Sequence, residues 1–156
     1  MTAGDILREA LLVVEKVTVK SNEDIELGEL IYNDGNGFLA MPNTATAAKA
    51  YVALEAHDYS EVSYHDIRAA VIGKVTVQKV TGAIKEGDIV CISTTDGAVT
   101  KFVKGDAPTG GVSTYYTTTI ETGVQTALDT NLTKVGTCAA DAASGDATVD
   151  IWLGVY

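Results

Sequence analysis

The sequence predicts a small all-β protein of one domain, built from two related hairpin units. Three observations support this prediction. Short β-branched segments recur in the same order, Asp-Gly and Asn-Gly pairs follow them, and residues 147–156 alternate apolar and polar side chains. Alternation with a period of two is typical of a half-buried strand, and the Gly-containing pairs are typical of tight hairpin turns.

An internal repeat contains most of the predicted strands. The tetrapeptide Lys-Val-Thr-Val begins each copy, at Lys16 and, 58 residues later, at Lys74. A glycine, an acidic residue and an apolar strand come next, at Gly28 and, 59 residues later, at Gly87. A turn and a third strand complete each copy. Because hairpin units of this size cannot each bury a core alone, we expect the two copies to pack into one barrel or sandwich.

The repeat lies inside a larger predicted division of the chain. Residues 1–15 form an N-terminal arm, in which the apolar spacing over 5–14 predicts two or three helical turns before the chain becomes strand. Residues 16–156 form the barrel domain. Residues 105–134 are a Thr- and Gly-rich excursion from that domain, and long excursions often carry function.

The C-terminal segment 147–156 is the predicted final strand. In this prediction the odd-numbered residues from Val149 to Val155 face the core, and Trp152 faces outward as a candidate contact residue.

Charge and hydropathy exclude several classes of partner. Twenty-one acidic residues against eleven basic ones give a formal net charge of −10, which repels phosphate backbones and anionic membranes. The longest apolar run, residues 10–14, is far shorter than the roughly 20 residues that a membrane span needs. We therefore expect no nucleic-acid partner and no membrane partner, and we expect no secretory signal peptide.

Cysteine and histidine form no recognisable catalytic or metal set. Cys91 and Cys138 lie 47 residues apart outside any Cys-x-x-Cys pattern and are expected to be reduced thiols. His57 and His65, with carboxylates nearby, could serve a hydrolase or bind zinc or manganese if their connection folded back on itself. Because their spacing matches no helical face, a solvated connection between strands is the favoured interpretation.

Other motifs point away from catalysis as well. Residues 33–37 faintly resemble a calcium loop but lack its closing glutamate, and a hairpin turn accounts for them. The chain contains neither a Gly-x-Ser-x-Gly elbow nor a Gly-rich phosphate loop. We therefore expect a protein that is not an enzyme, without catalytic residues, cofactor or metal.

Aromatic and apolar residues outside the predicted core point to protein binding instead. Tyrosine and tryptophan are enriched in protein interfaces because they bury a large area yet tolerate partial wetting. The candidate interface residues are Ile6, Leu7, Leu11, Tyr115, Tyr116 and Trp152.

Three short motifs carry a resemblance to a known family. Leu-Gly-Glu-Leu-Ile at 27–31 and Glu-Gly-Asp-Ile-Val at 86–90 each start a strand. Residues 135–153 combine Val-Gly, a run of small residues, Ser-Gly-Asp and an alternating strand. This combination resembles the small capsid decoration, or cement, proteins of tailed viruses. Residues 1–15 and 105–134 lie outside the resemblance.

The resemblance implies a β-barrel or β-tulip body that binds the outer surface of a capsid. It implies the major capsid protein as partner, at joints between its subunits, a homotrimer as the binding form, and a role in stabilising the shell. The protein would then reside in the virion after assembly in the host cytoplasm, and the apolar residues 6–14 could add to a neighbour's sheet edge.

Besides a hydrolase that uses His57, His65 and nearby carboxylates, two alternatives remain open at this point. One is another virion component, such as a tail, fibre or spike protein. The other is an extracellular or cell-surface binding module, in which Tyr115, Tyr116 and the Thr-rich excursion contact glycan or protein.

Overall fold

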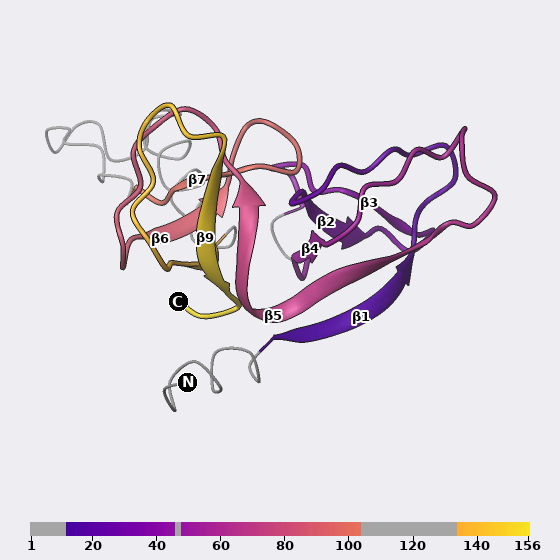
Figure 1. Cartoon of the computed structure of the whole chain (residues 1–156), viewed down its shortest axis with the longest axis horizontal. Coiled ribbons are helices and arrows are strands. Elements are labelled where there is room, and N and C mark those ends of the chain that lie inside the picture. The colour runs from indigo at the N-terminus through magenta and orange to yellow at the C-terminus, as the bar shows by residue number, and fades with distance from the viewer. Residues whose placement is uncertain (1–11, 46–47, 104–133) are drawn as a thin grey trace, which may run out of the picture.

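The computed structural model describes residues 12–45, 48–103 and 134–156, which contain strands, turns and isolated bridges but no helix (Figure 1). The strands are β1 (Val13–Thr18), β2 (Leu30–Asn33), β3 (Phe38–Ala40), β4 (Tyr51–Ala53), β5 (Asp66–Gln78), β6 (Ile89–Ile92), β7 (Val99–Lys101), β8 (Lys134–Cys138) and β9 (Thr148–Leu153). The curled antiparallel sheet that they form confirms the predicted all-β fold of the barrel class.

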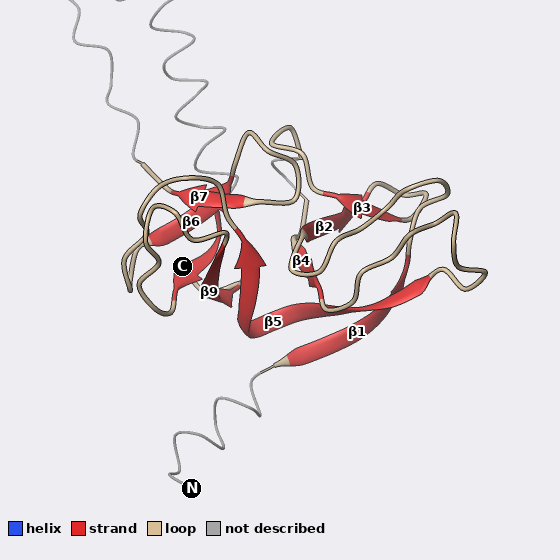
Figure 2. Cartoon of the chain, turned by 45° about the horizontal axis from the view of Figure 1, so that its top comes forward, coloured by secondary structure: helices blue, strands red, loops and turns tan. Residues whose placement is uncertain are grey.

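All nine strands belong to one sheet, which the long strand β5 divides into two units (Figure 2). In the first unit, β1 and β4 pair with β5, β2 pairs with β4, and β3 pairs with β2. In the second unit, the C-terminal part of β5 pairs with β9, β9 with β8, β8 with β6, and β6 with β7. Strand β5 is therefore the last strand of the first unit and the first strand of the second.

A single parallel bridge closes each unit into a ring of strands. Val19, just after β1, bridges Phe38 in β3, and Lys79, just after β5, bridges Val99 in β7. The two rings use equivalent parts of the two sequence copies. The two copies of the predicted repeat thus supply equivalent strands to two rings, which share β5 and are completed by β4 in the first unit and by β8 and β9 in the second.

The repeated Lys-Val-Thr-Val tetrapeptide makes the same side-chain contacts in both units. In the first unit, Lys16 Nζ lies 3.3 Å from a carboxylate oxygen of Asp66, and Thr18 Oγ1 donates a 2.5 Å hydrogen bond to that carboxylate. In the second unit, Asp150 accepts a 2.6 Å hydrogen bond from the equivalent threonine and lies 3.8 Å from the equivalent lysine. Cross-strand pairs of this kind stabilise neighbouring strands, which gives the repeated motif a structural reason.

A glycine in the middle of β5 marks the change from one unit to the other. The pairing with β1 reaches Ile72, and the pairing with β9 starts at Gly73, where φ is 122°. Residues with a Cβ rarely adopt this backbone region, whereas glycine enters it readily. Figure 1 shows β5 turning sharply between its contacts with β1 and with β9.

The buried side chains form two clusters. The larger one joins Leu30, Met41, Val52 and Ala70 of the first unit to apolar residues from every strand of the second unit. The smaller one belongs to the first unit alone and consists of Val17, Val19, Ile25, Ile31, Phe38, Ala53, Ile67 and Ala69. The larger cluster therefore joins the two units, while most buried apolar residues of the first unit pack in its own cluster.

A turn of the second unit also docks onto the first. The carbonyl oxygen of Gly97, between β6 and β7, accepts a 2.7 Å hydrogen bond from Leu30 N–H, and Gly97 N–H donates to Met41 O at 3.0 Å. A Cβ at Gly97, where φ is 75°, would overlap the side chain of Glu29. This close approach requires glycine and holds the two units together.

The predicted arm ends earlier in the chain than expected. Strand β1 begins at Val13, so residues 13–15 belong to the sheet, and the helical turns predicted over 5–14 are wrong at Val13 and Val14. Two adjacent β-branched residues favour strand over helix at this point. Residues 1–11 and most of the predicted excursion, 104–133, lie outside the described residues, and Lys134 already begins β8.

The contact between β8 and β9 generates a prediction about Gly136. A Cβ at this position would overlap the carbonyl oxygen of Trp152 on the neighbouring strand, and a backbone group cannot move aside cheaply. Gly136→Ala is expected to lower the free energy of unfolding by about 1–3 kcal/mol, measured by urea denaturation. Gly145→Ala in the following turn is the matched control, because a Cβ atom added there would meet no heavy atom of another residue, apart from its chain neighbours, within 4 Å. Equal stability of the two variants would contradict the close packing of β8 on β9.

Candidate protein-binding surface

Exposed apolar side chains gather around the bend of β5. Val13 pairs with Ile72 across β1 and β5, and their exposed fractions are 46% and 42%. Val155 and Tyr156, which follow β9, are exposed by 50% and 69%. Gly154, which precedes them, lies next to Ile72: a Cβ atom added to this glycine would be 3.4 Å from Ile72 Cγ1. We call Val13, Ile72, Val155 and Tyr156 the bend surface.

Backbone contacts fix the C-terminal part of the bend surface. Gly154, where φ is 76°, donates a 2.8 Å hydrogen bond from its N–H to Val135 O in β8. Thr137 Oγ1 donates a 2.6 Å hydrogen bond to Val155 O. The prediction that Val155 faces the core is wrong, because the chain leaves the strand at Gly154 and the alternation of β9 stops there.

Strand β1 extends the bend surface along an open sheet edge. Its first four residues, 13–16, are exposed, and the strand has both Val13 and Val14 among the exposed large apolar residues. Within the described part of the chain, β1 pairs with β5 along one edge only, apart from the bridge at Val19. An unpaired edge with exposed valines can accept another strand or an apolar surface.

The structure places one of the predicted interface residues. Trp152 lies in β9, half-buried, opposite Lys74 of β5 and Thr137 of β8. The other five predicted residues lie outside the described part of the chain, and they are Ile6, Leu7, Leu11, Tyr115 and Tyr116.

Sequence reasoning missed Ile72, although a signal was present. The outward side chains of β5 alternate through Lys74 and Thr76, and continuing that alternation backward places Ile72 on the same outer face. An apolar residue at an outward strand position is a signal of this kind of surface.

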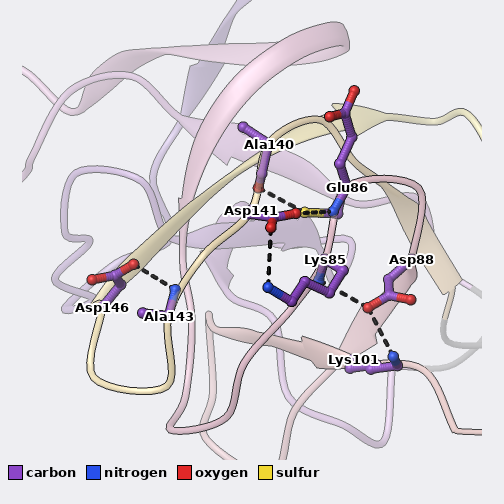
Figure 3. A network of polar contacts seen from close by, with 9 residues as sticks. Lys85, Glu86, Asp88, Lys101, Ala140, Asp141, Ala143 and Asp146 are labelled. Atoms are coloured by element: carbon purple, nitrogen blue, oxygen red, sulfur yellow. Dashed lines mark hydrogen bonds and ion pairs between the residues drawn. The ribbon is translucent and has the colours of Figure 1, made fainter.

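Carboxylates near the other end of the second unit form a network that secures loops (Figure 3). Asp88 accepts a 2.9 Å hydrogen bond from Lys85 N–H and pairs with Lys101 at 2.8 Å. Asp141 accepts a 2.8 Å hydrogen bond from Glu86 N–H and pairs with Lys85 Nζ at 3.0 Å. The Asp141 contacts fasten the loop before β6 to the loop after β8, and the Asp88 contacts join the loop before β6 to Lys101 in β7.

The same contacts set the acidity of the two carboxyl groups. The Lys101 side chain, followed by Lys85 N–H, lowers the pKa of Asp88. The backbone hydrogen bond from Glu86, followed by the Lys85 ammonium, lowers the pKa of Asp141. Both carboxylates are therefore held in the ionised form, which suits a structural role better than proton transfer.

The surroundings of Cys138 disfavour its activation as a nucleophile. Cys91 and Cys138 are both buried and are not joined by a disulfide. Burial raises the pKa of the Cys138 thiol, which donates a 3.0 Å hydrogen bond to Ala140 O. A raised pKa makes a thiol less reactive at neutral pH.

The expected hairpin turn at residues 33–37 is confirmed, whereas the connection that carries the histidines differs from expectation. In the turn, Asn33 Oδ1 and Asp34 Oδ1 accept hydrogen bonds from backbone N–H groups two residues further on. His57, expected in a solvated connection, is buried, and its Nε2 lies 3.2 Å from Nδ1 of His65. Among the described residues, no group of three or more His, Cys, Asp or Glu side chains is placed to hold a metal ion.

Comparison with known proteins adds no relative. No protein-family model matches the chain, and no curated protein matches it. Within the residues that the structure describes, no helix has the length and apolar character needed to cross a membrane.

The carboxylate network predicts a loss of stability in acid. The pKa of Asp141 in the folded protein lies below its ordinary value of 3.8. At pH values between the folded pKa and the ordinary one, the unfolded chain therefore binds more protons than the folded chain. The stability that Asp141 contributes is thus fully present above the ordinary value and is lost as the pH falls through the lower, folded value. Glu29 has the opposite effect on the pH dependence of stability, because burial raises its pKa.

We expect Asp141→Asn to be less stable than the wild type at about pH 6 and to approach it as the pH is lowered to about 3. The urea midpoint of unfolding, measured at intervals across this range, tests the expectation. A stability difference that stays constant over the whole range would show that the ionised form of Asp141 contributes nothing.

Proposed function

We propose that this protein is a non-catalytic capsid decoration protein of a tailed virus. It binds the outer surface of the shell at joints between copies of the major capsid protein, and it stabilises the shell by adding buried interface across those joints. The motifs at 27–31, 86–90 and 135–153 support this class of protein, and so does the all-β body of the barrel class.

The single observation that carries the proposal is the bend surface next to the open edge of β1. Four apolar side chains that are exposed by 42–69% lie around the bend in the middle of the shared strand. Compact proteins commonly use such patches as contact surfaces, and a sheet edge beside the patch adds main-chain hydrogen bonds to apolar burial.

Charge is compatible with the proposed use of this surface. A net charge of −10 keeps free copies apart in solution and discourages binding to packaged nucleic acid. In the proposed homotrimer each contact with the shell is made three times, so a modest surface on each copy supports strong overall binding.

Substitution of Ile72 tests the proposal directly. Ile72→Thr keeps a β-branched side chain in the strand but removes apolar area from the bend surface. We expect this variant to bind about tenfold more weakly to shells assembled from the major capsid protein of the same genome, measured by co-sedimentation.

Val62→Thr is the matched control, because Val62 is exposed by the same 42% but lies in the loop between β4 and β5, outside the bend surface. Its binding is expected to equal that of the wild type. Failure of the wild-type protein to sediment with the shells, or an equal loss in both variants, would contradict the proposal.

A further inference from the structure

The two histidines of the chain meet in the first unit, on the loop between β4 and β5. His57 Nε2 lies 3.2 Å from His65 Nδ1, and the ring centroids are 5.3 Å apart. His57 is 6% exposed, and His65 is half-buried. Tyr59 stacks on His65 with centroids 3.9 Å apart and an interplanar angle of 10°. The two imidazoles are therefore held with one nitrogen of each directed toward the other.

The second unit shows that the fold does not need a histidine at this place. His57 forms an antiparallel backbone bridge with Ile25, with hydrogen bonds of 2.7 and 2.9 Å. Ala142 forms the equivalent bridge with Ile84 in the second unit, with hydrogen bonds of 2.8 and 3.0 Å. An alanine thus makes the same pair of backbone hydrogen bonds, so the bridge does not require the imidazole of His57.

We propose that His57 and His65 form a binding site for a divalent transition-metal ion of the class that prefers imidazole, such as Cu²⁺, Ni²⁺ or Zn²⁺. Metal–nitrogen distances of about 2.0–2.1 Å place two tetrahedral ligand nitrogens roughly 3.3 Å apart, and two ligands at a right angle roughly 2.9 Å apart. The observed 3.2 Å lies between these values.

Binding requires a shift of protons within the pair but no net release. A neutral imidazole carries one N–H and one lone pair, so both ligating nitrogens must present lone pairs. The proton now shared between His57 Nε2 and His65 Nδ1 moves to the far ring nitrogen of its own residue when the metal binds. Rotations of about 35–45° then direct both lone pairs to one point beside the line that joins the nitrogens.

The site offers two protein ligands and leaves the remaining positions to water. The carboxylates that interact with the two histidines are engaged elsewhere, because Asp58 Oδ1 accepts the Ser60 hydroxyl at 2.7 Å and Asp66 Oδ1 accepts the Thr18 hydroxyl at 2.5 Å. Two imidazoles with open positions bind an exchangeable ion, and affinity rises toward Cu²⁺ along the divalent series.

Copper binding by the full chain without a histidine tag tests the proposal. Because His57 and His65 are the only histidines, imidazole nitrogens detected by electron paramagnetic resonance on bound Cu²⁺ come from this pair. We expect one Cu²⁺ per chain with two imidazole ligands, and one Ni²⁺ per chain by calorimetry. His57→Ala and His65→Ala should each weaken Ni²⁺ binding by at least about tenfold.

His57→Ala copies the residue found at the equivalent bridge, so its folding is expected to persist and is checked by circular dichroism. A Cys91→Ser/Cys138→Ser double variant that keeps the two-imidazole signal excludes thiolate ligands. Copper bound without imidazole nitrogens, or Ni²⁺ binding that survives both histidine variants, would overturn the proposal. So would the absence of Cu²⁺ and Ni²⁺ binding at neutral pH.

Discussion

Strand β5 belongs to both rings of strands, and the rest of the structure depends on this sharing. One strand of 13 residues completes the ring of the first unit and begins the ring of the second, with Gly73 at the change of partner. Neither ring can lose β5 without opening. The larger apolar cluster and the Gly97 contact reinforce the same connection, because both join residues of one unit to residues of the other.

The shared strand also explains where the exposed apolar surface arises. At the bend, β5 leaves β1 and joins β9, so the start of β1, the bend itself and the end of β9 meet at one place. No ring encloses this junction, and the side chains there, including Ile72, remain exposed. The surface proposed for binding is in this sense a consequence of joining two small rings through one strand.

Much of the fold could be predicted from the sequence because its determinants are local and repeated. The Lys-Val-Thr-Val tetrapeptide fixes an alternating strand in each copy, and the Gly-acidic pairs and Asp-Gly turns fix where the next strands begin. The sharing of β5 was not predictable in this way. It depends on which partner lies beside each half of the strand, and alternation alone does not specify partners.

The candidate sites also depend on contacts between distant residues that local sequence patterns do not specify. The sequence predicts a solvated loop for His57 and His65, because no local period relates residues eight positions apart. The bridge between His57 and Ile25, a residue far away in the chain, draws this loop inward and brings the imidazoles together. Alternation alone predicts that Val155 faces the core, but the positive φ of Gly154 ends the strand before it.

Equilibrium unfolding in urea, followed by one reporter in each unit, tests the central claim most directly. Trp152, the only tryptophan, reports on β9 by fluorescence, and the ring protons of the two histidines report on the first unit by NMR. If both units depend on β5, the two reporters give the same midpoint and the same steepness. Two separate transitions would contradict the account, since the rings would then be independent modules joined by a passive strand.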